Sequence, residues 1–168
     1  MEPLVSIIMG STSDYEIMEK AAKFLDDNGI PFEINALSAH RTAEKVTEFA
    51  RNAEKRGVKV IIAGAGMAAA LPGAVAAETS LPVIGVPIKT GFEGLDSVLS
   101  MLQMPPGIPV ATVAVNGSMN AAVLATEILS LCDKNIREKM HAYKASLKDK
   151  IIKANQDLAQ KKFKNRVF

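Results

Sequence analysis

A predicted strand meets a predicted helix at Leu37-Ser38-Ala39-His40-Arg41-Thr42, and this junction decides the fold. Before it, residues 31–37 alternate apolar and polar side chains, which is typical of a half-buried strand. After it, apolar residues recur at helical spacing as far as residue 53, and Thr42 stands where a helix N-cap is expected. This succession of strand, turn and helix predicts a parallel α/β sheet, which binds ligands at the carboxyl ends of its strands.

His40 and Arg41 lie on this turn and supply two chemistries that a ligand site needs. An imidazole titrates near neutral pH and both takes and gives a proton, while a guanidinium holds a phosphate through two parallel hydrogen bonds. The other histidine, His141, falls in a basic helix and is predicted to be a solvated surface residue. From these residues alone, a surface turn without any catalytic role stays open as the alternative.

The N-terminal segment repeats the succession of strand, turn and helix. An apolar run at residues 4–9 has the length of a strand, and Gly-Ser-Thr-Ser-Asp follows at residues 10–14. A helix is then predicted to end near residues 28–29, which are Asn-Gly. Hydroxyls and backbone N–H groups at a helix start favour an anion, and Asp14 can accept hydrogen bonds from sugar hydroxyls. Serine and aspartate also cap helices for structural reasons, so this turn alone leaves both interpretations open.

Glycines mark the end of the third predicted strand, at residues 58–63. Residues 63–73, Ala-Gly-Ala-Gly-Met-Ala-Ala-Ala-Leu-Pro-Gly, are predicted to form a loop that lets a ligand approach the backbone closely. Their spacing does not match the dinucleotide fingerprint G-x-G-x-x-G, and no acidic residue follows at the usual distance. An NAD site is therefore not predicted.

The remaining elements complete the predicted fold. Strands are expected at residues 82–86 and 110–115, a loop at 87–95, and helices at 96–102, 119–132 and 133–158. We predict one catalytic α/β domain over residues 1–168, with a three-layer, doubly wound, mainly parallel five-stranded sheet of the flavodoxin-like or Rossmann-like type. The last helix is long and carries one apolar face, so residues 133–168 are predicted to form an arm that packs on neighbouring subunits.

The charge of the chain is unevenly distributed. Residues 1–133 carry 9 basic and 15 acidic side chains, a net charge of −6, whereas residues 134–168 carry 11 basic and 3 acidic ones, a net charge of +8. The basic arm has few aromatic side chains and no base-reading motif, so nucleic acid is not the expected partner. The acidic body of another copy of the chain is the better match, and a solvated helix face without a partner stays open as the alternative.

Cysteine content and hydropathy narrow the class of protein further. The single cysteine, Cys132, excludes an internal disulfide framework and suits the cytoplasm; it is predicted to be a small core residue. Two long uncharged stretches, residues 60–77 and 97–126, are interrupted by glycine and proline. They are therefore expected to belong to a buried core and not to span a membrane.

Four motifs together resemble the family of N5-carboxyaminoimidazole ribonucleotide mutases, also known as the catalytic subunit of phosphoribosylaminoimidazole carboxylase. They are Met-Gly-Ser-Thr-Ser-Asp at residues 9–14, Ser-Ala-His-Arg-Thr at 38–42, Ile-Ala-Gly-Ala-Gly with Leu-Pro-Gly at 62–66 and 71–73, and Gln-Met-Pro with Gly-Ile-Pro-Val at 103–105 and 107–110. The motifs cover most of residues 4–130 in the family's order. Their combination is specific, although no single motif is.

The resemblance implies an activity of purine biosynthesis and a set of residue roles. The implied reaction moves a carboxyl group from N5 to C4 of a ribonucleotide, without metal or other cofactor, in a homo-octamer whose sites lie at subunit contacts. His40 is the implied proton shuttle. The implied substrate-binding residues are Ser11, Ser13, Asp14, Ser38, Arg41, Gly64, Ala65, Gly66, Met67 and Leu71.

Ala70 departs from the family, many members of which have Ala-Ala-His-Leu-Pro-Gly in this loop. The missing histidine leaves open a direct carboxylation of aminoimidazole ribonucleotide by carbon dioxide. The usual Arg-Ser-Asn segment of that branch, however, does not match residues 64–67. A non-catalytic module that binds a phosphoribosyl nucleotide is the third possibility. His40 argues against it, since binding alone needs no base that works at neutral pH.

Overall fold

Five parallel strands form the centre of the fold. They are β1 (Val5–Met9), β2 (Phe32–Ala36), β3 (Val60–Gly66), β4 (Val83–Ile88) and β5 (Ala111–Thr112). The computed structural model describes residues 2–165, so residue 1 and the last three residues of the predicted arm lie outside the described part of the chain. The strands follow the order β2-β1-β3-β4-β5, and every neighbouring pair is parallel. The predicted doubly wound five-stranded sheet is confirmed.

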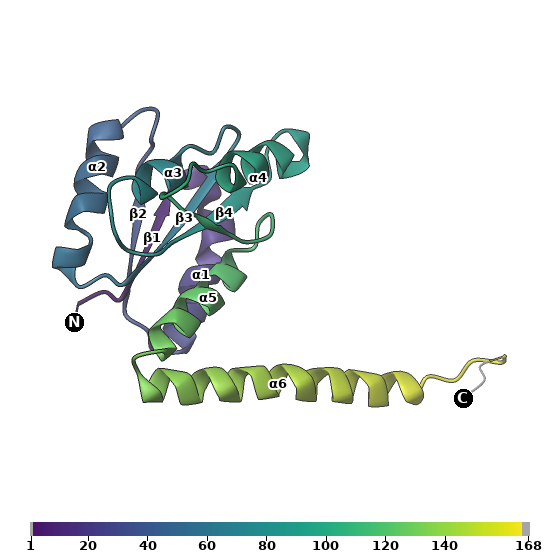
Figure 1. Cartoon of the computed structure of the whole chain (residues 1–168). Coiled ribbons are helices and arrows are strands. Elements are labelled where there is room, and N and C mark those ends of the chain that lie inside the picture. Colours follow the sequence, from purple (N-terminus) through teal and green to yellow (C-terminus); the bar gives the residue numbers. More distant parts are fainter. Residues whose placement is uncertain (1, 166–168) are drawn as a thin grey trace.

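Helices cover both faces of this sheet (Figure 1). One face carries α1 (Tyr15–Asp27) and α5 (Ser118–Ser130), and the other carries α2 (Ala43–Asn52), α3 (Leu71–Ala76) and α4 (Leu95–Leu102). Short 3₁₀ turns lie at Thr12–Asp14, Glu54–Arg56 and Phe92–Gly94. Because both faces are covered, β1, β3 and β4 are buried almost throughout and are nearly continuous apolar runs.

β3 is longer than predicted, because the glycine-rich segment continues the strand as far as Gly66. Its last two residues pair with the last two residues of β4, which also extends beyond its predicted end. Residues 64–66 therefore belong to the sheet and not to a loop. Packing explains the glycine at residue 64, since a Cβ atom there would lie 2.5 Å from the sulfur of Met18 in α1.

Three other local predictions were wrong. β5 has two residues instead of the predicted six, because only Ala111 and Thr112 pair with β4. The end of the predicted loop 63–73 forms α3, a helix of six residues that is too short to show helical periodicity in the sequence. Cys132 is exposed and lies outside the core, since it falls in the corner between α5 and α6.

α6 (Lys134–Ala159) is anchored to the domain by its first turns. The carboxylate of Asp133 caps the helix by accepting hydrogen bonds from the backbone N–H groups two and three residues later. Ile136 and Met140 are buried against the core, and Tyr143 packs edge-on against Phe24 of α1, with ring centroids 5.1 Å apart. The first ten residues of the helix are thus part of the domain.

The second half of α6 extends away from the domain (Figure 1). Its apolar side chains are exposed, and Ile151 is 72% exposed. His141 is exposed, as predicted. None of the helices within residues 2–165 combines the length and the apolar character that crossing a membrane requires.

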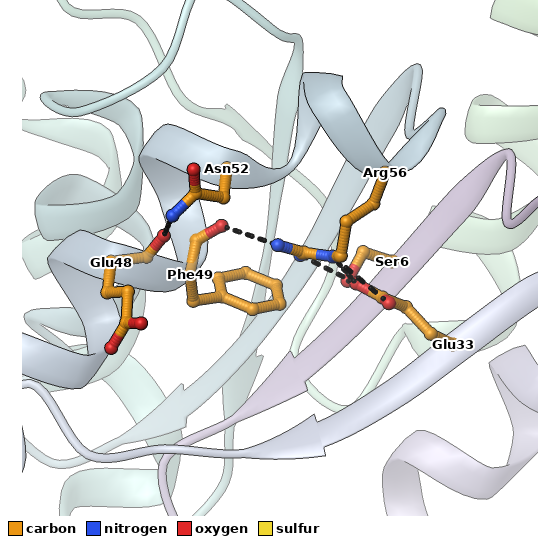
Figure 2. A network of polar contacts seen from close by, with 6 residues as sticks. All are labelled: Ser6, Glu33, Glu48, Phe49, Asn52 and Arg56. Atoms are coloured by element: carbon orange, nitrogen blue, oxygen red, sulfur yellow. Dashed lines mark hydrogen bonds and ion pairs between the residues drawn. The ribbon is translucent and has the colours of Figure 1, made fainter.

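A network of polar side chains joins the amino ends of β1 and β2 to α2 (Figure 2). Glu33 accepts hydrogen bonds from the Ser6 hydroxyl and from the Arg56 guanidinium, both at 2.8 Å. Arg56 also donates to the carbonyl oxygen of Phe49 at 3.2 Å, and its guanidinium carbon lies 4.8 Å from the centroid of the Phe49 ring. The network therefore ties together segments that are distant in the sequence.

Replacing Arg56 by methionine is expected to lower the free energy of unfolding by about 1–2 kcal/mol, because Glu33 loses a charged partner and Phe49 loses a cation over its ring. The side chains of Arg56 and Glu33 are 32% and 25% exposed, so water compensates part of the loss. Arg51→Met is the matched control. Arg51 pairs with Glu78 at 2.7 Å but is 65% exposed, and a loss below about 0.5 kcal/mol is expected. Equal losses in urea unfolding would contradict a stabilising role of the network.

Candidate active site

A cavity of about 590 Å³ opens at the carboxyl ends of β1, β2, β3 and β4. Its wall consists of residues in the turn 10–14 after β1, the turn 38–41 after β2, the segment 65–71 at the end of β3, and Thr90 after β4. The strand order reverses here, since β1 connects outward to β2 whereas β3 lies on its other side. Open parallel sheets bind their ligands at this reversal, which makes the cavity the candidate active site.

The turn after β1 presents two hydroxyls and a carboxylate. The Ser11 hydroxyl oxygen accepts a hydrogen bond from the backbone N–H of Ser13 at 3.3 Å, which begins the 3₁₀ turn. The Ser13 hydroxyl donates to the Asp14 carboxylate at 3.3 Å. Asp14 is only 8% exposed and still contributes to the cavity wall. The turn therefore offers a ligand both hydrogen-bond donors and an acceptor.

Burial raises the pKa of the Asp14 carboxyl, and hydrogen bonds from Ser13 and Ser11 and the charge of Arg41 oppose this only in part. Because the pKa is higher in the folded state, the folded protein binds this proton more readily than the unfolded chain does. The contribution of Asp14 to the free energy of unfolding therefore falls as the pH rises through its titration range.

Asp14→Asn is expected to be more stable than the wild type at pH 7, because the amide does not bury a charge. This advantage is expected to shrink as the pH is lowered into the range where the wild-type carboxyl takes up its proton, a range that burial shifts to higher pH than that of a solvated aspartate. Urea unfolding of both proteins across this pH range measures the difference. A variant less stable than the wild type at pH 7 would contradict the raised pKa.

The turn after β2 holds Arg41 against the turn after β1. The Arg41 guanidinium donates to the Ser38 hydroxyl oxygen at 3.3 Å and to the Gly10 carbonyl oxygen at 3.1 Å. Its other N–H groups have no acceptor among the described residues. A guanidinium fixed at one side in this way keeps its remaining donors for an anion in the cavity.

Thr42 closes this turn and is the N-cap residue of α2, as predicted, but its side chain does not cap the helix. The hydroxyl instead accepts from the backbone N–H of Ser38 at 2.9 Å and donates to the Ser38 carbonyl oxygen at 3.0 Å. His40 lies between these residues, exposed at the cavity wall, and its imidazole has no hydrogen-bond partner within residues 2–165. The imidazole is therefore available to a ligand.

The segment that follows β3 has a strained backbone. Met67 and Ala69 have φ angles of 55° and 33°, a left-handed conformation that costs residues other than glycine about 1 kcal/mol or more. The Thr90 hydroxyl oxygen accepts a hydrogen bond from the Met67 N–H, and the Ser97 hydroxyl donates to the Met67 carbonyl oxygen. Strain of this kind persists only where neighbouring groups impose it, and it is frequent at functional sites.

The structure brings ten of the eleven predicted site residues to this cavity. The ten are Ser11, Ser13, Asp14, Ser38, His40, Arg41, Ala65, Gly66, Met67 and Leu71. Gly64 is the exception, since it is buried inside β3 against Met18 and does not line the cavity. Within residues 2–165, no three His, Cys, Asp or Glu side chains gather in a way that could hold a metal ion.

The sequence prediction missed several residues of the wall, which are Gly10, Ala39, Ala68, Ala69 and Thr90. Thr90 was missed because β4 was expected to end at residue 86 and ends at Ile88. The signal that could have identified Thr90 was a hydroxyl two residues after the end of a buried strand. Ala70, noted as a departure from the family, also lines the cavity.

The fold and the cavity place the chain in the class of doubly wound α/β proteins with a polar small-molecule site at the carboxyl end of the sheet. A family model described as AIR carboxylase matches residues 4–150, and the chain belongs to this family.

Relatives and a solved structure agree with this assignment. The chain is 57% identical to the N5-carboxyaminoimidazole ribonucleotide mutase of Pyrococcus abyssi over 147 residues, 87% of this chain and 84% of that protein. It is 48% identical to the mutase of the same name from Bacillus subtilis over 161 residues, 94% of this chain and 99% of that protein. The crystal structure of Treponema denticola PurE gives a TM-score of 0.84 at 39% identity and covers 93% of this chain and 98% of that one. The resemblance noted in the sequence is confirmed.

Proposed function

We propose that this protein is an isomerase of purine biosynthesis, which converts N5-carboxyaminoimidazole ribonucleotide to 4-carboxy-5-aminoimidazole ribonucleotide. Relatives that match almost the whole chain bear the name of this mutase. The observation that carries the proposal is the meeting of His40, Arg41 and the Ser11–Asp14 turn in one cavity. In this proposal His40 is the proton carrier, and the groups beside it are suited to a ribose phosphate.

The polar turns bind the ribose phosphate in this proposal. Arg41 and the Ser11 hydroxyl contact the phosphate, since a guanidinium and a hydroxyl are its natural donors. Ser38 and Ser13 are supporting polar groups, because the Ser38 hydroxyl oxygen accepts from Arg41 and the Ser13 hydroxyl donates to Asp14. Asp14 accepts hydrogen bonds from the ribose hydroxyls. The opposite part of the wall, at residues 65–71, surrounds the imidazole ring and the carboxyl group that moves.

His40 carries the proton through both half-reactions. The bond between N5 and the carboxyl carbon breaks, its electron pair stays on N5, and N5 takes a proton from the His40 imidazolium. Aminoimidazole ribonucleotide and carbon dioxide are then together in the cavity. C4 attacks the carbon dioxide to form the new carbon–carbon bond, and the now neutral imidazole removes the proton from C4. All atoms are conserved, and His40 returns to its first protonation state.

Ala70 lines the cavity where many family members have a histidine, so no second imidazole takes part in this scheme. The smaller side chain also leaves room in the wall. Direct carboxylation of aminoimidazole ribonucleotide is the second candidate function, and Ala70 is the observation that favours it.

The decisive experiment gives the purified protein N5-carboxyaminoimidazole ribonucleotide without ATP or metal and follows formation of the C4-carboxylated product. A rate well above the spontaneous one supports the mutase. Product formed only from aminoimidazole ribonucleotide and bicarbonate would move the protein to the direct carboxylases. Failure of both reactions, with ligand still bound, would indicate a binding module.

A homo-octamer in the cytoplasm is part of the same proposal. The exposed apolar side chains on the outer half of α6, together with the charges of −6 and +8 on the body and the arm, suit packing between copies of the chain. Sedimentation velocity of the full chain tests this. A monomer at micromolar concentration would contradict it.

A further inference from the structure

We infer that Thr90 and Ser97 are positioning residues, which hold the backbone of residues 67–70 in the shape that receives the carboxyl group during its transfer. The inference rests on the proposed function, whose scheme uses neither side chain. Thr90 follows β4 and Ser97 lies in α4, so both act on the cavity wall from neighbouring elements.

The two hydroxyls hold both polar backbone groups of Met67. Its N–H donates to the Thr90 hydroxyl oxygen at 3.1 Å. The Ser97 hydroxyl oxygen lies 3.3 Å from the Met67 carbonyl oxygen and 3.1 Å from the carbonyl oxygen of Ile88, so its proton is shared between a residue of the wall and the last residue of β4. Ser97 is completely buried. Met67 is therefore fixed to the end of β4 from both sides.

The hydrogen bonds from Thr90 and Ser97 are needed because the residues with a left-handed backbone in this segment are not glycine. Met67 and Ala69 have positive φ angles, which a free chain would avoid. The preceding residue, Gly66, permits the contact with Thr90, since a Cβ atom on it would lie 2.7 Å from the Thr90 methyl carbon. The close approach of the segment to Thr90 thus depends on Gly66, and its left-handed shape depends on the two hydroxyls.

The held segment presents unused hydrogen-bond donors to the cavity. The Ala69 N–H bonds to the Gly66 carbonyl oxygen at 3.0 Å, whereas the N–H groups of Ala68 and Ala70 have no acceptor within residues 2–165. Both alanines line the cavity. Backbone N–H groups that are fixed in a turn stabilise negative charge without rearranging. In this reaction the negative charge is on the carboxylate that leaves N5 as carbon dioxide and forms again at C4. Without the hydrogen bonds of Thr90 and Ser97 to Met67, we expect carbon dioxide to leave the cavity before C4 captures it.

Thr90→Val, which keeps the shape and removes the acceptor, tests the inference. We expect kcat to fall about tenfold with KM changed by less than about twofold, because the lost interaction acts on the moving group and not on the ribose phosphate. We also expect a several-fold larger share of the consumed substrate to leave as aminoimidazole ribonucleotide. Thr90→Ser is expected to restore kcat and the share of released aminoimidazole ribonucleotide to their wild-type values. Ser97→Ala is expected to lower kcat and to raise this share, as Thr90→Val does.

Thr79→Val is the matched control. The Thr79 hydroxyl oxygen accepts a hydrogen bond from the Leu81 N–H at 3.2 Å, which is the same kind of bond outside the cavity. This variant is expected to leave the product ratio unchanged. A purely structural role of Thr90 would lower stability in both variants without changing that ratio.

Hydrogen exchange of the Met67 amide gives a readout independent of activity. We expect faster exchange in Thr90→Val than in the wild type and in Thr90→Ser. If the wild type is active but Thr90→Val leaves the exchange of the Met67 amide or the product ratio unchanged, the inference is overturned while the proposed function stands. A wild type that converts no substrate would overturn the proposed function and the inference with it.

Discussion

Replacing His40 by asparagine is expected to lower the turnover of N5-carboxyaminoimidazole ribonucleotide by about 10²–10⁴-fold, which is the usual contribution of general acid–base catalysis. Asparagine keeps the approximate size and polarity of the side chain but cannot carry a proton from one substrate atom to another. His40 is exposed and has no hydrogen-bond partner in the described part of the chain. Its replacement is therefore expected to change the free energy of unfolding by less than about 0.5 kcal/mol.

Single-turnover kinetics measure the effect of His40→Asn on catalysis, and equilibrium binding of the substrate measures its effect on affinity. We expect the dissociation constant to stay within about threefold of the wild type, since catalysis and not ground-state binding is lost. His141→Asn is the matched control, because His141 is exposed on α6 and does not line the cavity. Equal activity of His40→Asn and the wild type would exclude His40 as the proton carrier.

Replacing Arg41 by methionine is expected to raise KM about 10–100-fold, since a hydrogen bond to a charged group contributes about 1.5–3 kcal/mol. Arg41 is already fixed by its bonds to Ser38 and to the Gly10 carbonyl oxygen, so little entropy is lost when its free donors meet a phosphate. Methionine fills similar space but supplies no donor. It also releases Ser38 and Gly10 from Arg41, so the turns after β1 and β2 lose one link between them.

Arg41→Lys distinguishes charge from geometry. An ammonium keeps the charge but does not bond two oxygens in parallel, so an intermediate KM is expected. Arg51→Met is the control for loss of a surface charge, because Arg51 is exposed and does not line the cavity. A KM that stays at the wild-type value in Arg41→Met would show that the phosphate binds elsewhere.

Much of the sheet and more than half of the cavity wall were predictable, because local patterns locate the strands and turns and the family resemblance adds the glycine-rich segment. Strands with apolar runs and turns rich in Ser, Asp, His and Arg alternate along the chain, and parallel topology brings every such turn to one edge of the sheet. His40 and Asp14 are 26 positions apart in the sequence and still line the same cavity. This result needed only the order of the elements.

The structure differs from expectation where the contacts of a side chain are not set by the local sequence pattern. The family resemblance implied that Gly64 lies beside the substrate, whereas the structure places it inside β3 against the sulfur of Met18 and outside the cavity wall. Thr42 is the N-cap residue of α2, as predicted, but its hydroxyl bonds to Ser38, four residues earlier in the chain, and not to the helix. Cys132 has the residue type of a core position and lies at an exposed corner. Neither the contacts of Gly64 and Thr42 nor the exposure of Cys132 is apparent from the sequence pattern.

The polar network of Ser6, Glu33 and Arg56 has a consequence for how such a protein can evolve. Ser6 lies near the amino end of β1 and Gly10 directly follows its carboxyl end, so the network is at one end of the strand and the cavity is at the other. Mutations in the turns around the cavity can therefore accumulate without weakening the network, and changes in the network can alter thermal tolerance without altering the chemistry. A lineage that adapts to a new temperature and a lineage that adapts to a new substrate would change different ends of the same sheet.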